Sequence, residues 1–174
     1  GDDLRIMRAM GHLDLESRKG KAPGGYNYPL EEIGVPFIFM NSAGLHRDMV
    51  TMVHEGGHAL HSILTRDLPL TENKNVPSEV AELASMSMEL LTMNTWDAYF
   101  KDANLLNRAK SEQLEGIIGT LPWIAQVDAF QHWIYENPNH SKEERTQQWL
   151  ELCTRFGSGE IDFSGLESAL ENSW

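Results

Sequence analysis

The sequence lacks several features that would place it in common classes of protein. It has one cysteine among 174 residues, Cys153, so no internal disulfide can staple the chain. No apolar run approaches the roughly 18 residues that a membrane span requires. With 26 acidic against 14 basic residues, it also lacks the excess positive charge that favours binding to nucleic acid or anionic membranes. We therefore expect neither partner, and the single cysteine fits a reducing compartment.

The composition is that of an ordinary globular protein. Hydrophobic residues make up 41% of the chain and charged residues 23%, which argues against disorder. The length suits one domain with its own core, and the sequence does not specify an oligomeric state. Cys153 follows an apolar helical stripe at 149–152, which indicates a buried structural thiol rather than a nucleophile or a metal ligand.

The most informative segment is residues 54–61, which read His-Glu-Gly-Gly-His-Ala-Leu-His. Apolar residues around it predict a helix from about 47 to 65. His54 and His58 are four residues apart, so they lie on one helical face, from which both imidazoles can bind one zinc ion. Glu55 lies beside them and could accept a proton from an attacking water. The pattern is typical of a zinc hydrolase, most often a peptidase.

A catalytic zinc site needs a third protein ligand and an open position for water. A second helix, predicted over about 77–93, supplies Glu79, Glu82 and Glu89. Glu79 and Glu82 are helical neighbours, and Glu82 and Glu89 share a face. The spacing therefore leaves Glu79 or Glu82 as the third ligand, while Glu89 could hold the second ring nitrogen of a ligand histidine. Without the histidine motif, a solvated face would explain these glutamates better.

His61 lies seven residues after His54, on the same side of the predicted helix. It could bind the metal, contact a ligand from outside, or stabilise the helix. We expect the second of these roles.

The remaining sequence predicts a mainly α protein with one small sheet. Residues 1–20 have helical spacing, at least in part. A short apolar run at 35–40, bounded by proline and glycine, predicts a strand. Residues 26–28 could pair with it as an antiparallel hairpin, which places the strand region at about 25–41. The active-site helix would follow this sheet directly.

The chain from 96 to 174 is predicted to be helical. We expect a break near Asp102 and a new helix that begins at Pro122, because proline is favoured in a first turn. Ser141 and Glu144 form a capping-box pattern, which predicts a helix over about 142–156.

Residues 54–61 resemble the His-Glu-x-Gly-His-x-x-His segment of the thimet oligopeptidase and oligoendopeptidase F family of zinc peptidases. Residues 81–85, Ala-Glu-Leu-Ala-Ser, resemble an Ala-Glu-Val-Ala-Ser segment of the oligoendopeptidase F branch, whose glutamate is the third ligand. The resemblance thus implies Glu82 rather than Glu79 as the ligand. It also places Glu89 close to the metal ligands.

Segments 18–26 and 36–41 are similar to the same family, and the resemblance is strong from about 14 to 89. It implies a zincin-like, mostly helical catalytic domain with a deep channel that admits short peptides. The small sheet would edge this channel, where an exposed strand binds an extended peptide through main-chain hydrogen bonds. The implied substrate-binding candidates on this segment are Phe37, Phe39, Gly24 and Gly25, and the glycines would allow close approach of backbone.

The sequence departs from the family in one respect. Family members place a histidine and tyrosines well after the third ligand, where they bind substrate and stabilise the oxyanion. No matching segment precedes Trp174, and Tyr135 has different surroundings. Family members are also several times longer. The resemblance therefore implies a fragment, with residues 1–174 forming a single partial catalytic domain that binds zinc but turns over poorly.

These observations together predict a zinc endopeptidase that hydrolyses internal bonds of oligopeptides in the cytoplasm. One Zn²⁺ per chain would be bound by His54, His58 and Glu82, with Glu55 as general base. One alternative is a catalytically incomplete metal-binding module, against which the intact Glu55 argues. Another is a zinc amidase for a non-peptide substrate, against which the strand beside the motif argues.

Overall fold

The computed structural model describes all residues, 1–174, and divides the chain into two compact units, residues 1–106 and 107–174. The sequence predicts one partial domain over the whole chain. That both units belong to one catalytic domain stays a prediction.

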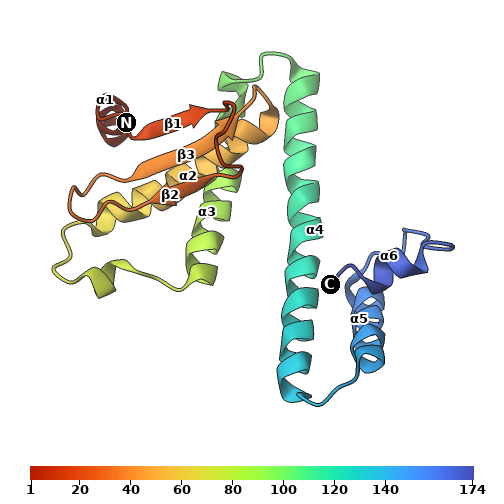
Figure 1. The fold of residues 1–174 in the computed structure, drawn as a ribbon. Coiled ribbons are helices and arrows are strands. Elements are labelled where there is room, and N and C mark those ends of the chain that lie inside the picture. The colour runs from red at the N-terminus through yellow and green to blue at the C-terminus, as the bar shows by residue number, and fades with distance from the viewer. The chain divides into compact units, whose positions relative to one another are not determined.

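A three-stranded sheet forms one layer of the first unit (Figure 1). β3 (Phe37–Ser42) lies in the middle and pairs antiparallel with β2 (Tyr26–Tyr28), which confirms the predicted hairpin. On its other side β3 pairs in parallel with β1 (Leu13–Glu16). The sheet is therefore mixed, whereas the sequence predicts only antiparallel pairing.

The N-terminal segment contains this unexpected strand. The first helix, α1, covers only Asp2–Ala9, and Gly11 then adopts a positive φ of 72° that ends the helical path. Leu13 and Leu15 alternate along β1 and pack against the core around Ile38. The prediction that residues 1–20 are at least partly helical therefore holds for residues 2–9. It misses β1, because Leu13 and Leu15 are buried by pairing with β3, which helical spacing does not reveal.

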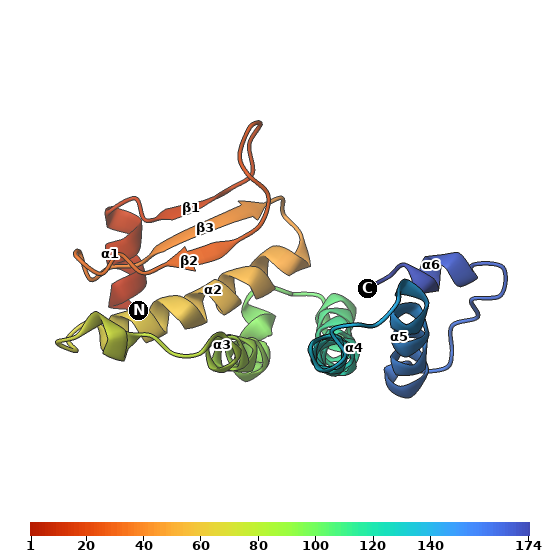
Figure 2. The ribbon, with the colours of Figure 1, turned by 60° about the horizontal axis from the view of Figure 1, so that its bottom comes forward.

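The active-site helix, α2 (His46–Thr65), lies across the sheet and matches the predicted bounds. Figure 2 shows the sheet on one side of α2 and α3 (Ser78–Thr92) on the other. The 3₁₀ turn η1 (Thr71–Lys74) connects the two helices. Between the sheet and the helices lies a core of apolar side chains from three elements, namely Met7, Ile38, Met40 and Ala59.

Gly57 sets how closely α2 and α3 approach. A Cβ atom at this position would lie 3.2 Å from the Cα atom of Ser85 and 3.2 Å from Cγ of Met88, whereas one at Gly56 would meet nothing within 4 Å. The glycine therefore allows the backbone of α3 to lie directly against α2. This contact brings the glutamate face of α3 to the histidines.

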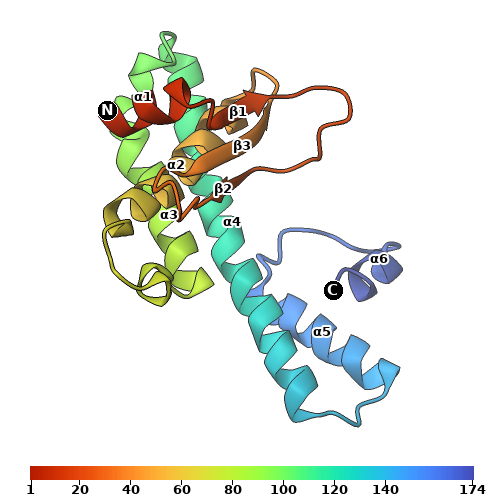
Figure 3. The same cartoon turned by 60° about the vertical axis from the view of Figure 1, so that its left-hand side comes forward.

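A long loop joins β1 to β2 and extends beyond the sheet (Figure 3). The Asn41 amide donates to the carbonyl oxygens of Ala22 and Gly24, at 2.8 and 2.9 Å, and so holds the loop. Its last residue, Gly25, lies so close to α2 that a Cβ would be 3.2 Å from Cγ2 of Thr51. Gly25 thus permits the loop to lie against α2, and its predicted role in substrate binding stays a prediction.

The second unit is helical. It contains most of α4 (Ala103–Glu136), followed by α5 (Lys142–Phe156) and α6 (Glu167–Glu171), whereas the 3₁₀ segment η2 (Met93–Ala98) belongs to the first unit. No helix of the chain is both long and apolar enough to span a bilayer. The core of this unit is apolar and is formed by Phe130, Trp149 and Leu152.

Of the three features predicted for this region, the break near Asp102 and the capping box at Ser141 are confirmed. The chain is irregular between η2 and α4, and the Asp102 carboxylate accepts from the backbone N–H groups of Asn104 and Leu105. Ser141 caps α5 by the predicted reciprocal bonds with Glu144. Pro122, however, lies inside α4 rather than at a helix start. The proline removes one helical hydrogen bond, but helix-forming residues on both sides continue the same helix across it.

Candidate metal centre

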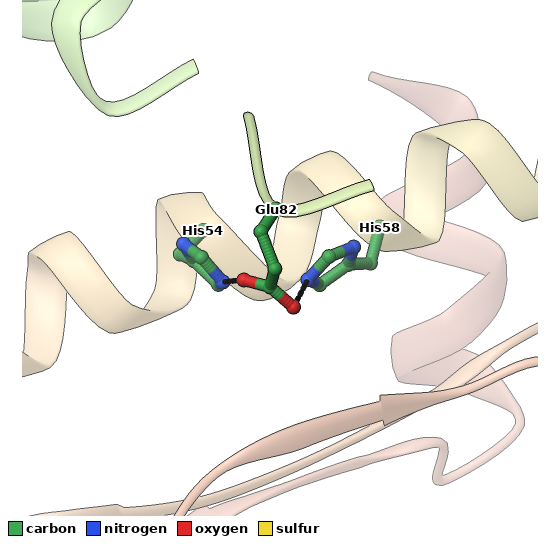
Figure 4. A group of neighbouring side chains, drawn as sticks. All are labelled: His54, His58 and Glu82. Carbon is green, nitrogen blue, oxygen red and sulfur yellow. Dashed lines mark ion pairs between the residues drawn. The ribbon is translucent and has the colours of Figure 1, made fainter. Parts of the chain in front are cut away.

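Three side chains from two helices converge in the first unit (Figure 4). His54 and His58 stand one turn apart on α2, and Glu82 of α3 lies between them. Its carboxylate oxygens lie 3.1 Å from Nε2 of His54 and 3.5 Å from Nε2 of His58. One ligand atom from each residue lies within 4.8 Å of the other two. Two imidazole nitrogens and a carboxylate oxygen at this separation form a donor set suited to one zinc ion.

The other ring nitrogen of each histidine is held by α3. His54 Nδ1 lies 2.8 Å from Oε1 of Glu89, and His58 Nδ1 lies 2.9 Å from Oγ of Ser85. These bonds orient both rings so that Nε2 points towards Glu82. Such partners fix the tautomer and the ring orientation of metal-binding histidines. The arrangement therefore fits a metal site in its outer contacts as well as in its donors.

The two histidines differ in their electrostatic surroundings. The hydrogen bond to Glu89 raises the pKa of His54 above its usual value, and burial only partly opposes this shift. Burial lowers the pKa of His58, whose ring bonds to a neutral hydroxyl rather than a carboxylate. Glu89 thus makes His54 the more basic imidazole of the pair.

Glu55 follows His54 on α2 and is only 7% exposed. Its burial raises the pKa of the carboxyl group, while the nearby His54 lowers it. The backbone N–H of Asn27, on edge strand β2, donates to this carboxylate. Asn27 lies opposite Ile38 in the sheet, but the N–H of Ile38 donates to the carbonyl oxygen of His12, on the side of β3 away from β2. Asn27 and Ile38 therefore exchange no hydrogen bonds, and the N–H of Asn27 points away from β3.

Two other candidates do not belong to the donor set, although His61 lines the same cavity as its members. Glu79 is exposed in the first turn of α3 and is not part of the donor set. His61 makes no hydrogen bond with His54, His58 or Glu82. Instead its Nε2 lies 2.9 Å from the carbonyl oxygen of Lys74, so that His61 ties α2 to the turn η1.

A cavity of about 550 Å³ lies between α2 and the β2 region, and the three donors and Glu55 line it. Of the four substrate-binding candidates, only Gly25 lines this cavity. Phe37 and Phe39 do not, because β3 is the central strand and β2 is the edge strand beside α2. The ring of Phe39 instead stacks on Tyr26, with ring centroids 4.9 Å apart. A role of these two phenylalanines in substrate binding stays a prediction.

Gly24 also lies outside the lining of the cavity. It adopts a φ of +101°, which requires glycine, so its role in the loop is conformational.

Three residues of the centre do not follow from the sequence reasoning above. Ser85 lies on the same helical face as the predicted glutamates, and this polar face is the signal in the sequence; its contact with His58 and its 1% exposure come from the structure. Gly57 lies inside the motif, but only the structure shows that it allows α3 to pack closely against α2. Asn27 contributes its backbone N–H to Glu55, and any residue except proline could supply that group, so the sequence does not reveal it.

The chain is similar to known peptidases over most of its length. The model of Peptidase family M3 matches residues 2–169. Oligopeptidase PepF of Bacillus subtilis is 30% identical over 154 residues, which is 86% of this chain and 23% of that protein. The plasmid-encoded oligoendopeptidase F of Lactococcus lactis is 29% identical over 124 residues, which is 71% of this chain and 20% of that protein.

Among solved structures, that of PZ peptidase A with an inhibitor has the same fold, with a TM-score of 0.83 and 33% identity. The similarity covers 98% of this chain and 30% of that one. This chain therefore spans about a fifth to a third of the length of the relatives it matches.

Proposed function

Since this chain belongs to Peptidase family M3 and the resemblance drawn from its motifs is thereby confirmed, we propose that it supplies the catalytic centre of a zinc-dependent oligoendopeptidase. Its substrates would be short peptides, cleaved at internal bonds. The observation that carries this proposal is the convergence of His54, His58 and Glu82 beside a buried carboxylate, Glu55.

The proposed metal ligands are Nε2 of His54, Nε2 of His58 and the carboxylate of Glu82. One zinc ion bound there would lower the pKa of a water molecule and polarise the carbonyl of the scissile bond. Glu89 and Ser85 hold the outer nitrogens of the two histidines, so the ligands are oriented before the metal binds.

Glu55 is proposed as the general base and then the general acid. Its burial raises the pKa of the carboxyl group above its usual value, which makes it a stronger proton acceptor than an exposed glutamate. It would accept a proton from the attacking water and transfer it to the departing amine. The N–H of Asn27 holds the carboxylate in place and favours its ionised form before the reaction.

Peptides are the proposed substrate class for two reasons. Relatives of this chain are named oligopeptidases and oligoendopeptidases. The cavity beside the ligands also lies along β2, an edge strand beside which an extended main chain could lie. Cytoplasmic residence stays a prediction from the single cysteine and the family.

The test of the proposed function is the substitution Glu55→Gln in the full-length protein. Hydrolysis of an internally quenched peptide should fall by about 10²–10⁴-fold, because the glutamine cannot accept a proton. Bound zinc should remain at one ion per chain. Glu79→Gln, an exposed change on α3, is the matched control and should leave both measurements unaltered.

Each alternative function gives a different result. A metal-binding module without catalysis would bind zinc and hydrolyse nothing even as wild type. An amidase for other substrates would lose activity with Glu55→Gln but would not cleave peptides. Full peptide hydrolysis by the Glu55→Gln protein would overturn the role of Glu55.

A further inference from the structure

The cavity beside the candidate metal centre continues past His58 to the C-terminal end of α2, where Arg66 lines its wall. Arg66 follows His58 by eight residues, which corresponds to about 12 Å along a helix that rises 1.5 Å per residue. A peptide bound at the centre could therefore reach this arginine.

Most other side-chain donors in this part of the cavity are already engaged. The hydroxyl groups of Ser62 and Thr65 donate to backbone carbonyl oxygens within α2, at 3.1 and 2.9 Å. The ammonium group of Lys74 pairs with Glu31 at 3.0 Å, with its side chain only 14% exposed. Because Lys74 and Glu31 neutralise each other, neither offers an unpaired charge to a ligand in the cavity.

Arg66 differs from these residues. Its aliphatic part passes close to Gly34, where a Cβ atom would lie 3.8 Å from Cδ of the arginine. Its guanidinium takes part in no hydrogen bond of the structure, and its side chain is 44% exposed. Asp67 approaches Nε only to 4.0 Å and is 94% exposed, so that carboxylate is solvated rather than bonded.

We propose that Arg66 is a specificity-determining residue that binds a carboxylate group of the peptide substrate. A guanidinium can bind a carboxylate through two parallel hydrogen bonds, which gives both strength and a defined position. At about 3.3 Å per residue of extended chain, the bound carboxylate lies three or four residues from the scissile bond. This inference rests on the proposed peptidase function.

The charge of the chain makes this contact selective. The formal net charge is −12, so an acidic peptide is repelled on average. An open cation at one point of the cavity therefore favours a carboxylate at that position of the peptide. The carboxylate is either the C-terminus, which lies on the side of the departing amine, or an aspartate or glutamate side chain.

The experiment compares three peptides that share one sequence around the cleaved bond. The first ends in a free carboxylate three residues beyond that bond, the second ends in an amide, and the third is an amide with aspartate as its last residue. The full-length protein is assayed as wild type, Arg66→Gln and Arg66→Lys. Arg47→Gln is the matched control, because Arg47 is exposed on the same helix and lies outside the cavity.

The expected result is a selective effect on KM. Arg66→Gln should lower kcat/KM for a carboxylate peptide by about tenfold, the effect of a hydrogen bond to a charged group, and should leave kcat nearly unchanged. The amide peptide should be unaffected. Arg66→Lys should recover part of the loss, because it keeps the charge without the planar fork. Whether the first or the third peptide is sensitive identifies the source of the carboxylate.

Equal loss for acid and amide peptides, or the same loss with Arg47→Gln, would overturn the role of Arg66 while leaving the proposed function intact. Failure of the wild type to cleave any of the three peptides would instead contradict the proposed function. Zinc content of Arg66→Gln, measured in parallel, should equal that of the wild type and shows that the centre is folded.

Discussion

The two compact units of this chain bury different kinds of side chain. The first unit buries polar groups beside its apolar core, with Glu55 7% exposed and Ser85 1% exposed. The second buries chiefly Phe130, Trp149 and Leu152, and its buried Gln126 donates to the sulfur of Cys153. A buried carboxylate costs free energy unless it is bonded, so the buried Glu55 beside two histidines distinguishes the first unit, whereas the second buries no charged side chain.

The largest effect that would sharpen this comparison is on stability. Trp149→Ala should lower the free energy of unfolding of the second unit by about 3–5 kcal/mol, because the indole is fully buried and donates to Leu170 and Ser173. Thermal unfolding followed by tryptophan fluorescence measures this loss. Trp123→Ala, at a position 49% exposed, should cost less. If Trp149→Ala also removed bound zinc, the two units would not be independent in function.

The next effect concerns the contact between α2 and α3. Gly57→Ala should destabilise the first unit by about 1–3 kcal/mol, because the new methyl group would press on the backbone of Ser85 at 3.2 Å. Gly56→Ala, its neighbour, faces open space and should stabilise the helix by about 0.5–1 kcal/mol. Urea denaturation of both variants measures the two changes in the free energy of unfolding. The same sign for the two changes would show that α3 does not lie as close as described.

The hydrogen bond between Glu89 and Nδ1 of His54 should affect zinc affinity more than it affects the stability of the fold. Glu89→Gln should weaken zinc binding by about 10–100-fold, because the carboxylate that orients and polarises the imidazole is lost. Competition with a chromophoric chelator gives the dissociation constant. Glu79→Gln removes the same charge from an exposed position of α3 and should leave that constant unchanged.

The smallest effect is expected at the other histidine. Ser85→Ala should weaken zinc binding by about 0.5–1.5 kcal/mol, because a neutral hydroxyl contributes one ordinary hydrogen bond to His58. Ser87→Ala is the control, since that hydroxyl donates only to the carbonyl of Leu83 in its own helix. We also predict that Glu89→Gln weakens zinc binding more than Ser85→Ala does. A larger loss with Ser85→Ala than with Glu89→Gln would contradict the difference drawn between the two histidines.

The elements around the motif follow from the sequence because their signals are local. The apolar period of α2, the proline before α3 and the short strand of β3 each depend on residues within a few positions. The donor pair His54 and His58 follows from helix geometry alone. The structure brings them together with Glu82, which the family resemblance selects and the spacing does not.

What the sequence does not predict depends on distant packing. Spacing alone does not distinguish Glu79 from Glu82. Which of the two lies with the histidines depends on how α3 packs against α2, where Ser85 and Met88 approach Gly57. β1 is a strand only because β3 lies beside it, and without β1 the central position of β3 cannot be recognised.

Metal content tests the central claim most directly. The purified chain should be loaded with zinc, dialysed and analysed for metal as wild type, Glu82→Ala and Glu79→Ala. We predict one zinc ion per chain in the wild type and in Glu79→Ala, and loss of that ion in Glu82→Ala, because only Glu82 lies with the two histidines. No zinc in the wild type, or equal zinc in Glu82→Ala, would contradict the metal centre described for this chain.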